Sequence, residues 1–209
     1  CSILDIMRDP TRDTLKINER QAALDLVCIA EKGELWCGMA EQVALEFAQH
    51  DQSIQDEAKK KLADLRICVE RIDKFSGILG VAGTIDFSHL DDLVQRARGL
   101  VQRWLDQFNQ IVPAPDVPAK AFTRMNAGIA PAKRGKDSSK DCLVYETCLE
   151  AATNLRVAGA VQPIVFLSSN IKEYSTEGGL LKAEIEREFT PLNLQFAPNM
   201  SAAKHQLGL

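Results

Sequence analysis

Oxygen-bearing side chains in three well-separated segments of this 209-residue chain could together carry out metal-assisted hydrolysis. Glu46 lies in EQVALEF, Asp141 and Glu146 in KDCLVYE, and Asn170 and Glu173 in SSNIKEY. Mg²⁺ prefers oxygen ligands and keeps several waters, so a few carboxylates suffice to hold it. Such an ion activates water and neutralises charge on a phosphodiester. Glu46, Asp141 and Glu173 are therefore candidate ligands of Mg²⁺ or Mn²⁺, with Asn170 and Glu146 as further candidate catalytic residues.

Each of these residues is also compatible with an ordinary structural role. Glu46 and Glu146 could be solvated helix residues, and Asn170 could belong to a turn. Asp141 could cap the helix that it begins, because an Asp there accepts backbone N–H groups and favours the helix dipole. The sequence leaves both interpretations open for each residue taken singly.

A basic cluster adjoins Asp141 in the segment KRGKDSSK. Acidic residues exceed basic ones, 29 against 25, so any contact with nucleic acid must be local rather than a matter of bulk charge. We predict that the cluster binds a phosphodiester backbone, although a solvated loop has the same composition. The predicted substrate-binding residues are Lys133, Arg134, Lys136 and Lys140.

The sequence lacks the motifs of a serine hydrolase, a P-loop and a zinc site. Neither Ser168 nor Ser169 lies in a GxSxG elbow or has a histidine nearby. The glycines of GILGVAG have no GKS or GKT sequel, so a P-loop is not supported. The histidines are far apart, and no cysteine stands at ligand spacing to form a zinc site. With no CxxC pair, the cysteines are interpreted as buried reduced thiols; these are Cys28, Cys37, Cys68, Cys142 and Cys148.

The elements that must position the candidate site alternate between helix and strand. Apolar spacing and glycine or proline breaks predict them. The helices fall at 18–31, from 41 onward, 52–75, 85–110, 141–158 and 180–189, the strands at 34–39, 163–167 and 192–196, and a long loop at 111–140. The helix at 52–75 is expected on the surface because many charges separate its apolar residues. Alternation of this kind favours an α/β fold around a parallel sheet, whose ligands bind beyond the carboxyl ends of the strands.

Several of these segments resemble the motifs of PIN-domain nucleases. SSNIKEY after PIVFL is similar to the final motif, with Asn170, Glu173 and Tyr174 in its last three roles. KDCLVYE resembles the preceding motif, and Glu46 resembles the second acid. The opening CSILDIMRDP resembles the continuation of the first motif, whose leading Asp would stand just before Cys1.

The resemblance implies a three-layer α/β/α sandwich around a central parallel sheet. Residues 1–209 would form one domain without its first few residues, with a helical and loop insertion at 52–140. It also implies a Mg²⁺- or Mn²⁺-dependent endonuclease that acts on RNA more than on DNA. A toxin or defence role, an inhibitor or antitoxin protein as partner, and a homo-oligomer are further expectations from the resemblance. Two departures stand out: the last acid is Glu173 rather than Asp, and the first acid lies outside the numbering.

Two other functions remain open at this level. One is a catalytically inactive PIN-like binding or scaffold domain, favoured if the residue before Cys1 is not acidic. The other is a phospho-accepting receiver-like domain, which lacks its expected Lys after a late strand. No apolar run is long enough to span a membrane and no signal peptide is evident, so we expect a cytoplasmic protein.

Overall fold

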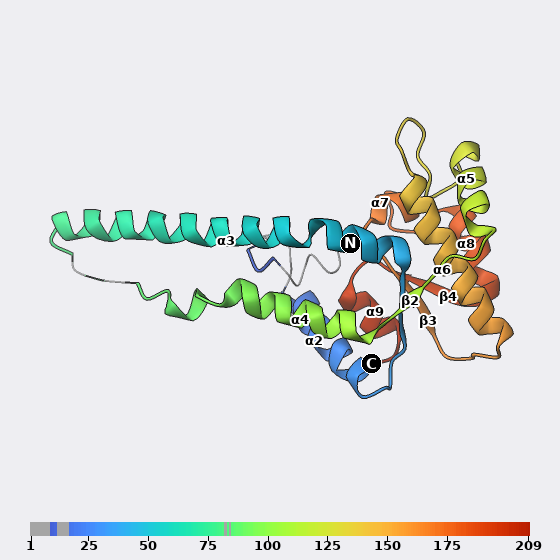
Figure 1. Cartoon of the computed structure of the whole chain (residues 1–209), viewed down its shortest axis with the longest axis horizontal. Coiled ribbons are helices and arrows are strands. Elements are labelled where there is room, and N and C mark those ends of the chain that lie inside the picture. Colours follow the sequence, from blue (N-terminus) through green and yellow to red (C-terminus); the bar gives the residue numbers. More distant parts are fainter. Residues whose placement is uncertain (1–8, 12–16, 82, 84) are drawn as a thin grey trace.

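The computed structural model describes residues 9–11, 17–81, 83 and 85–209 (Figure 1). The predicted first motif in CSILDIMR therefore lies outside the described residues. Within the described part, no helix is both long and apolar enough to cross a bilayer.

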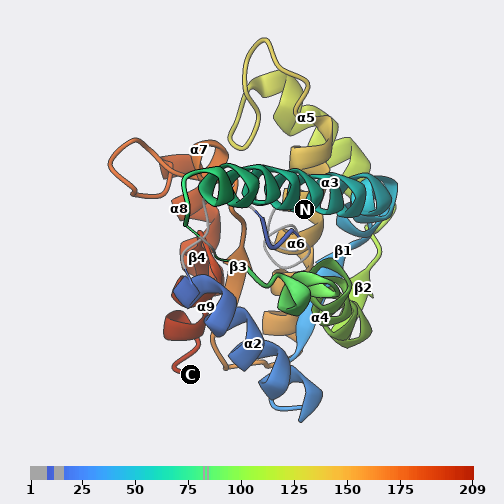
Figure 2. The same ribbon diagram turned by 90° about the vertical axis from the view of Figure 1, so that its left-hand side faces the viewer.

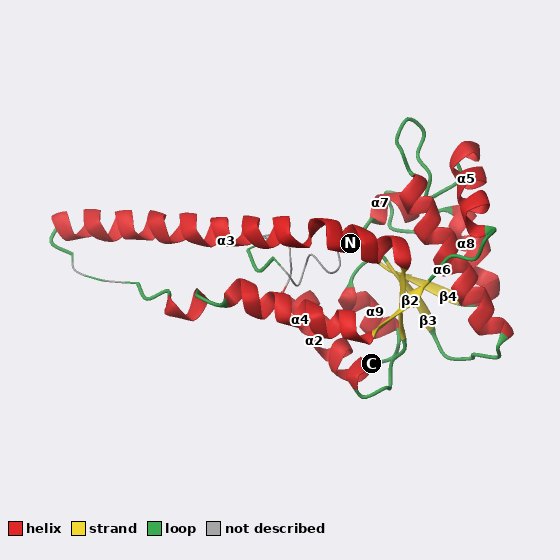
Figure 3. Cartoon of the chain, viewed as in Figure 1, coloured by secondary structure: helices red, strands yellow, loops and turns green. Residues whose placement is uncertain are grey.

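The described elements follow one another along the chain as mostly helices with four short strands between them, coloured by type in Figure 3. They are α2 (Ile17–Glu31), β1 (Cys37–Ala40), α3 (Glu41–Ile78), η1 (Ser88–Leu90), α4 (Leu93–Gln107), β2 (Phe108–Ile111), α5 (Val117–Ala127), α6 (Ser139–Val157), β3 (Ile164–Leu167), α7 (Ile171–Tyr174), α8 (Ala183–Phe189), η2 (Thr190–Leu192), β4 (Leu194–Ala197) and α9 (Met200–Gln206).

Most elements predicted from periodicity are confirmed to within a few residues, but three regions differ. The helices predicted from 41 onward and at 52–75 are one continuous helix, α3. Of the helix predicted at 85–110, only Leu93–Gln107 is α-helical, after the short turn η1. Phe108–Ile111 forms β2, because these residues pair with β1. The loop predicted at 111–140 contains α5, which has a proline in its first turn and ends at Gly128 with φ 64°. Proline at a helix start and glycine after its end are favourable signals, and Pro118 was wrongly interpreted as a loop residue. Pro113, Pro115 and Pro131 do lie outside helices and strands.

The strands form two separate parallel pairs among the described residues. β1 pairs with β2, Cys37 opposite Phe108, and β3 pairs with β4, Ile164 opposite Leu194. The predicted single central sheet is thus not seen in this part of the chain. A groove of about 1110 Å³, lined by every residue of β1 and of β3, separates the two pairs.

Helices cover both faces of these strands. On one face, α2, α4 and α9 form an apolar cluster with Leu26, Trp104 and Met200 at its centre, and Val165 of β3 and Met39 of β1 pack against it. On the other face, α6 and α8 pack through Tyr145, Ile185 and Phe189 against Phe166 of β3. Side chains of β3 therefore alternate between two helical layers.

A helical arm projects from this body (Figures 1 and 2). It consists of the 38-residue α3 and the returning η1 and α4. Only Phe47 and Ala58 of α3 are buried, which confirms the prediction of a surface helix. Ion pairs join its two sides, Arg98 Nε to Asp51 Oδ2 at 2.8 Å and Arg66 to Asp91.

Candidate active site

Asp141 lies at the centre of the candidate site, in the first turn of α6. Burial raises the pKa of its carboxyl, the Lys136 ammonium opposes this rise, and the nearby charges of Glu173 and Glu46 add to it. A hydrogen bond with the Asn170 side chain lowers the same pKa. Asp141 thus has four neighbours from three separate segments, namely Lys136, Glu46, Asn170 and Glu173.

The helix-capping alternative for Asp141 is not what the structure shows. Asp137 Oδ1 accepts the backbone N–H of Ser139 at 2.9 Å. The carboxylate that binds a backbone amide at the start of α6 is therefore that of Asp137. Asp141 instead lines the groove between the two strand pairs, together with Glu46 and Asn170.

Glu173 is the most deeply buried acid of the group, with 3% of its surface exposed, on the short helix α7 that follows β3. Its Oε1 lies 3.3 Å from Lys136 Nζ and 3.9 Å from Lys133 Nζ. Its Oε2 is buried and has no hydrogen-bond partner among the described residues. A buried carboxylate oxygen without a hydrogen-bond partner destabilises the folded state, so we expect a cation or a water to bind this atom.

Glu46 reaches the site from the second turn of α3, which begins directly after β1. Its Oε1 accepts a hydrogen bond from Gln42 Nε2 at 3.1 Å and lies 3.7 Å from Lys140 Nζ. Because α3 starts where β1 ends, the helix carries this carboxylate to the carboxyl end of the strand.

The basic loop is folded over the acids rather than free in solvent. Ser138, 1% exposed, accepts the backbone N–H of Lys133 at 3.1 Å, and Gly135 has φ 78°. This turn directs Lys133 and Lys136 to Glu173, while Lys140 pairs with Glu46. Arg134 lies against Gly128 at the end of α5 instead.

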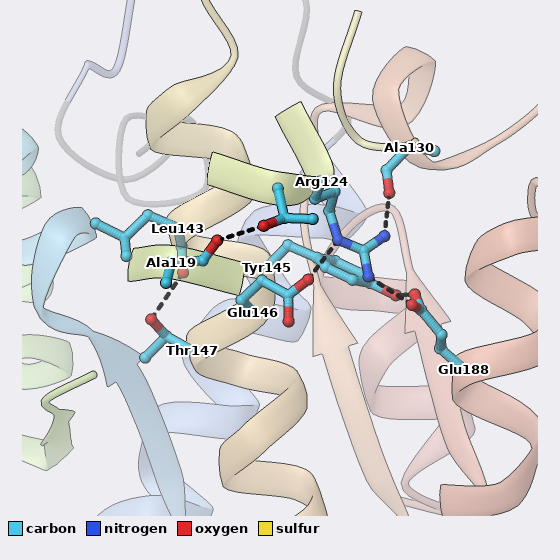
Figure 4. Close-up of polar contacts among 9 residues, drawn as sticks. Ala119, Arg124, Ala130, Leu143, Tyr145, Glu146, Thr147 and Glu188 are labelled. Atoms are coloured by element: carbon cyan, nitrogen blue, oxygen red, sulfur yellow. Dashed lines mark hydrogen bonds and ion pairs between the residues drawn. The ribbon is translucent and has the colours of Figure 1, made fainter. Parts of the chain in front are cut away.

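Glu146, predicted as a further catalytic residue, pairs with a buried arginine away from the groove. Its Oε1 binds Arg124 Nε at 2.5 Å, and Arg124 also donates to Glu188 Oε1 and to the Ala130 carbonyl (Figure 4). Arg124 is itself buried. Glu146 does not line the groove that contains Asp141; it helps to join α5 to α6 and α8.

Ser168 is a positioning residue that was not selected from the sequence. Its hydroxyl accepts the Asn170 backbone N–H at 3.3 Å and hydrogen bonds with Tyr174, whose pKa is raised chiefly by burial. Its own N–H donates to the Ala197 carbonyl of β4 at 3.0 Å. The signal was present, because Ser168 fills the Ser or Thr position of the SSNIKEY motif.

The carboxylate and amide oxygens of the site are of the chemical type that binds a hard divalent cation. Among the described residues, no three Asp, Glu, His or Cys side chains are close enough together to hold one ion. Mg²⁺ nevertheless retains several waters, and waters can bridge carboxylates that do not all touch the ion. The partnerless Glu173 Oε2 beside the Asp141 group is the observation that fits such a cation.

Comparison with known proteins identifies the family of the chain. No curated protein and no solved structure matches the chain significantly. A family model described as PIN domain matches residues 12–174, which include Glu46, Asp141, Asn170 and Glu173. This match covers well over half of the sequence, and the chain belongs to the PIN domain family.

Proposed function

We propose that this protein is a divalent-metal-dependent endonuclease that hydrolyses RNA. PIN domains are in general nucleases that use divalent metals, which supports a nuclease-type function for this chain. The observation that carries the proposal furthest is Glu173, a buried carboxylate with one oxygen unpartnered, next to Asp141.

Glu46, Asp141 and Glu173 would hold Mg²⁺ or Mn²⁺. The bound metal supplies activation of water and neutralisation of charge on the phosphate. Asn170 orients the Asp141 carboxylate by its hydrogen bond, and Ser168 fixes the turn that carries Asn170. Lys133, Lys136 and Lys140 offer positive charge where a phosphodiester backbone would approach the acids.

The lysines also explain how a net acidic protein could attract a polyanion. The chain has a formal charge of −4, so attraction must come from a local patch and from the metal. With their present partners, the lysines neutralise the carboxylates; with metal bound, the same ammonium groups would be available to phosphate. We expect such an enzyme to have an inhibitor or antitoxin protein and a second copy of the chain as binding partners. We also expect it to act in the cytoplasm.

A second candidate is a PIN domain that binds RNA without cleaving it. This alternative is favoured by one observation: no three acidic side chains of the described residues gather closely enough for one ion. It keeps the basic loop as the binding surface and removes the need for a metal.

A cleavage assay separates the two candidates. Labelled single-stranded RNA and DNA of the same sequence are incubated with the protein in Mg²⁺, in Mn²⁺ and in EDTA. We expect metal-dependent cleavage of RNA that falls by at least about 100-fold in Asp141→Asn, the size of effect expected when a group that stabilises the transition state is lost. The matched control is Asp137→Asn, an exposed acid at the start of the same helix.

Three outcomes are informative. Loss of cleavage in Asp141→Asn but not in Asp137→Asn supports the nuclease. RNA binding without cleavage in any metal supports the binding domain. Equal cleavage by the wild type and Asp141→Asn would assign the activity to a contaminant or to other residues.

A further inference from the structure

Lys136 places its charge on two of the proposed metal ligands. Its Nζ lies 3.3 Å from Glu173 Oε1. Burial raises the pKa of the Asp141 carboxyl, and the Lys136 ammonium is the nearby charge that opposes this rise. Lys133 Nζ lies 3.9 Å from the same Glu173 oxygen. The positive charge of this loop therefore acts on the carboxylates to which a divalent cation would bind.

The third proposed ligand, Glu46, has a lysine from the same loop beside it. Lys140 Nζ lies 3.7 Å from Glu46 Oε1. In both ion pairs the lysine is far more exposed than the acid. The side chain of Lys136 is 55% exposed against 4% for Glu173, and that of Lys140 is 62% exposed against 24% for Glu46. A lysine so exposed can leave its acid for solvent, whereas the buried carboxylate stays in place.

Acids outside the groove have a different kind of cation. Arg124, whose side chain is 7% exposed, binds both Glu146 and Glu188 and donates to the Ala130 carbonyl. A guanidinium held by several hydrogen bonds inside the protein is a fixed counter-ion. Ion pairs of exposed lysines are weak and are easily exchanged. The chain thus uses a fixed cation between its helices and exchangeable cations at the candidate site.

The backbone that carries these lysines is held in place. The buried Ser138 hydroxyl accepts the Lys133 N–H at 3.1 Å, and the Ser138 carbonyl accepts the Cys142 N–H at 2.9 Å. Asp137 Oδ1 accepts the Ser139 N–H at 2.9 Å. The loop is therefore tied to the first turn of α6, and only the flexible lysine side chains have to move when they exchange partners.

Two kinds of ligand would compete for these ion pairs from opposite sides. An ammonium and a divalent cation on the same carboxylate repel each other, so a metal that binds the acids releases the lysines. Phosphate oxygens form charge-assisted hydrogen bonds with ammonium groups, so a phosphodiester backbone that binds the lysines releases the acids. Each ligand thus removes an interaction that opposes the other.

We propose that Lys136, assisted by Lys133 and Lys140, couples the binding of the divalent metal to the binding of the RNA backbone, so that each ligand increases the affinity of the protein for the other. The inference rests on the proposed function and adds regulation to the same site. Lys136 is a positioning residue in this scheme, because it controls access to Glu173 and Asp141. Linkage requires that the two ligands raise each other's affinity by the same factor.

The first test measures metal affinity without RNA. Mn²⁺ is titrated into the protein, and the free ion is followed by electron paramagnetic resonance. We expect Lys136→Met to bind Mn²⁺ about fivefold more tightly than the wild type, which corresponds to loss of a competing ion pair of about 1 kcal/mol. Because Lys133 contacts the same oxygen, the double variant Lys133→Met, Lys136→Met is measured as well and should gain at least as much.

Two variants control for charge. Lys172→Met removes an equal charge from an exposed position directly before Glu173 and should change Mn²⁺ affinity much less. Lys136→Arg keeps the charge and should behave like the wild type. Melting temperatures separate coupling from a purely structural role: Lys136→Met should melt below the wild type in EDTA and together with it in saturating Mn²⁺. A lysine that only supports the fold would lower both values.

The second test measures RNA affinity with and without metal at equal ionic strength. The probe is a fluorescent single-stranded RNA made resistant to cleavage by 2′-O-methyl and phosphorothioate groups. Saturating Mn²⁺ should tighten its binding to the wild type by about fivefold or more, and clearly less in the double variant. Any gain from direct contact of the metal with phosphate is common to both proteins, so the difference reports the lysines.

The outcomes separate this inference from the proposed function. Mn²⁺ affinity that is unchanged or weaker in both lysine variants would overturn the coupling, as would an equal gain in Lys172→Met. An equal effect of Mn²⁺ on RNA affinity in the wild type and the double variant would also overturn it, while metal-dependent cleavage could still stand. A wild type that binds no Mn²⁺ would refute the metal-dependent nuclease itself, and the coupling with it.

Discussion

Lys136 Nζ lies 3.3 Å from Glu173 Oε1, on a carboxylate whose other oxygen is buried without a hydrogen-bond partner. The lysine is half exposed, and the glutamate is almost fully buried. A flexible ammonium at the mouth of the site therefore neutralises a fixed acid inside it. This pair links the basic loop to the carboxylate group, and it predicts how metal and RNA should act on the protein.

Mg²⁺ or Mn²⁺ should raise the thermal stability of the protein, because an ion that binds only the folded state stabilises it by an amount that grows with the logarithm of its concentration above Kd. The increase in unfolding free energy is about 2.7 kcal/mol when the metal concentration is about 100 times Kd. Calorimetry with increasing metal measures it. The shift should shrink in Asp141→Asn and persist in Asp137→Asn; equal shifts in all three proteins would show that Asp141 is not a ligand.

Neutralising the basic loop should weaken RNA binding and flatten its salt dependence. Each phosphate contact with a single strand contributes about 0.7 to the slope of log K against log salt. The variant Lys133→Ala, Arg134→Ala, Lys136→Ala is compared with its parent in an Asp141→Asn background that blocks turnover. Cleavage at saturating RNA, measured without the Asp141 change, should alter little.

The control for this prediction is an equal loss of charge on the helical arm. Lys59, Lys60 and Lys74 are exposed on α3, far along the chain from the loop, and their replacement by Ala should leave the slope unchanged. A loop variant with normal affinity, together with an arm variant of reduced affinity, would move the RNA path to the arm.

Arg124→Met should destabilise the protein by about 3 kcal/mol or more, because it leaves Glu146 and Glu188 as acids without their buried cation. The guanidinium also lies over the Tyr145 ring at 4.6 Å, and this contact would be lost. Urea unfolding followed by circular dichroism measures the change. Arg187→Met, on the exposed side of α8, should stay within about 0.5 kcal/mol, and a similar small effect at Arg124 would refute the role given to it.

Cysteine reactivity should divide the thiols into two groups. Cys28 and Cys68 are exposed, contrary to the prediction that all five thiols are buried, because α2 and the arm present these positions to solvent. Burial raises the pKa of Cys142 to about 11 and that of Cys148 to about 12. Since the thiolate is the reactive form, both should hold very little of it near pH 8.

Alkylation with iodoacetamide at pH 8, followed by peptide mapping, checks this order. Cys28 and Cys68 should be modified first in the folded protein, and all thiols should react alike in urea. Early modification of Cys142 in the native state would contradict this order, because that thiol is buried.

Periodicity and motif spacing predicted most of the helices, although not α5, and they predicted β3. These features are local. A helix is recognised from apolar residues at 3.6-residue intervals, and SSNIKEY places Asn170 and Glu173 close together independently of the rest of the chain. Regions without such a local signal were harder. Phe108–Ile111 continues a helical pattern and becomes β2 only because β1 lies alongside it.

The sequence by itself determined that this is an α/β protein of the PIN domain family and that Glu46, Asp141, Asn170 and Glu173 are its candidate site residues. Only the tertiary structure decided the partners of each charge. Glu146 lies five residues after Asp141, yet Arg124 of α5 draws it into a buried ion pair, while Lys136 and Lys140 turn back to Glu173 and Glu46. The physical reason is that pairing depends on which side chains meet in a low-dielectric interior, and residue spacing along one helix does not specify what the other helices bring to it.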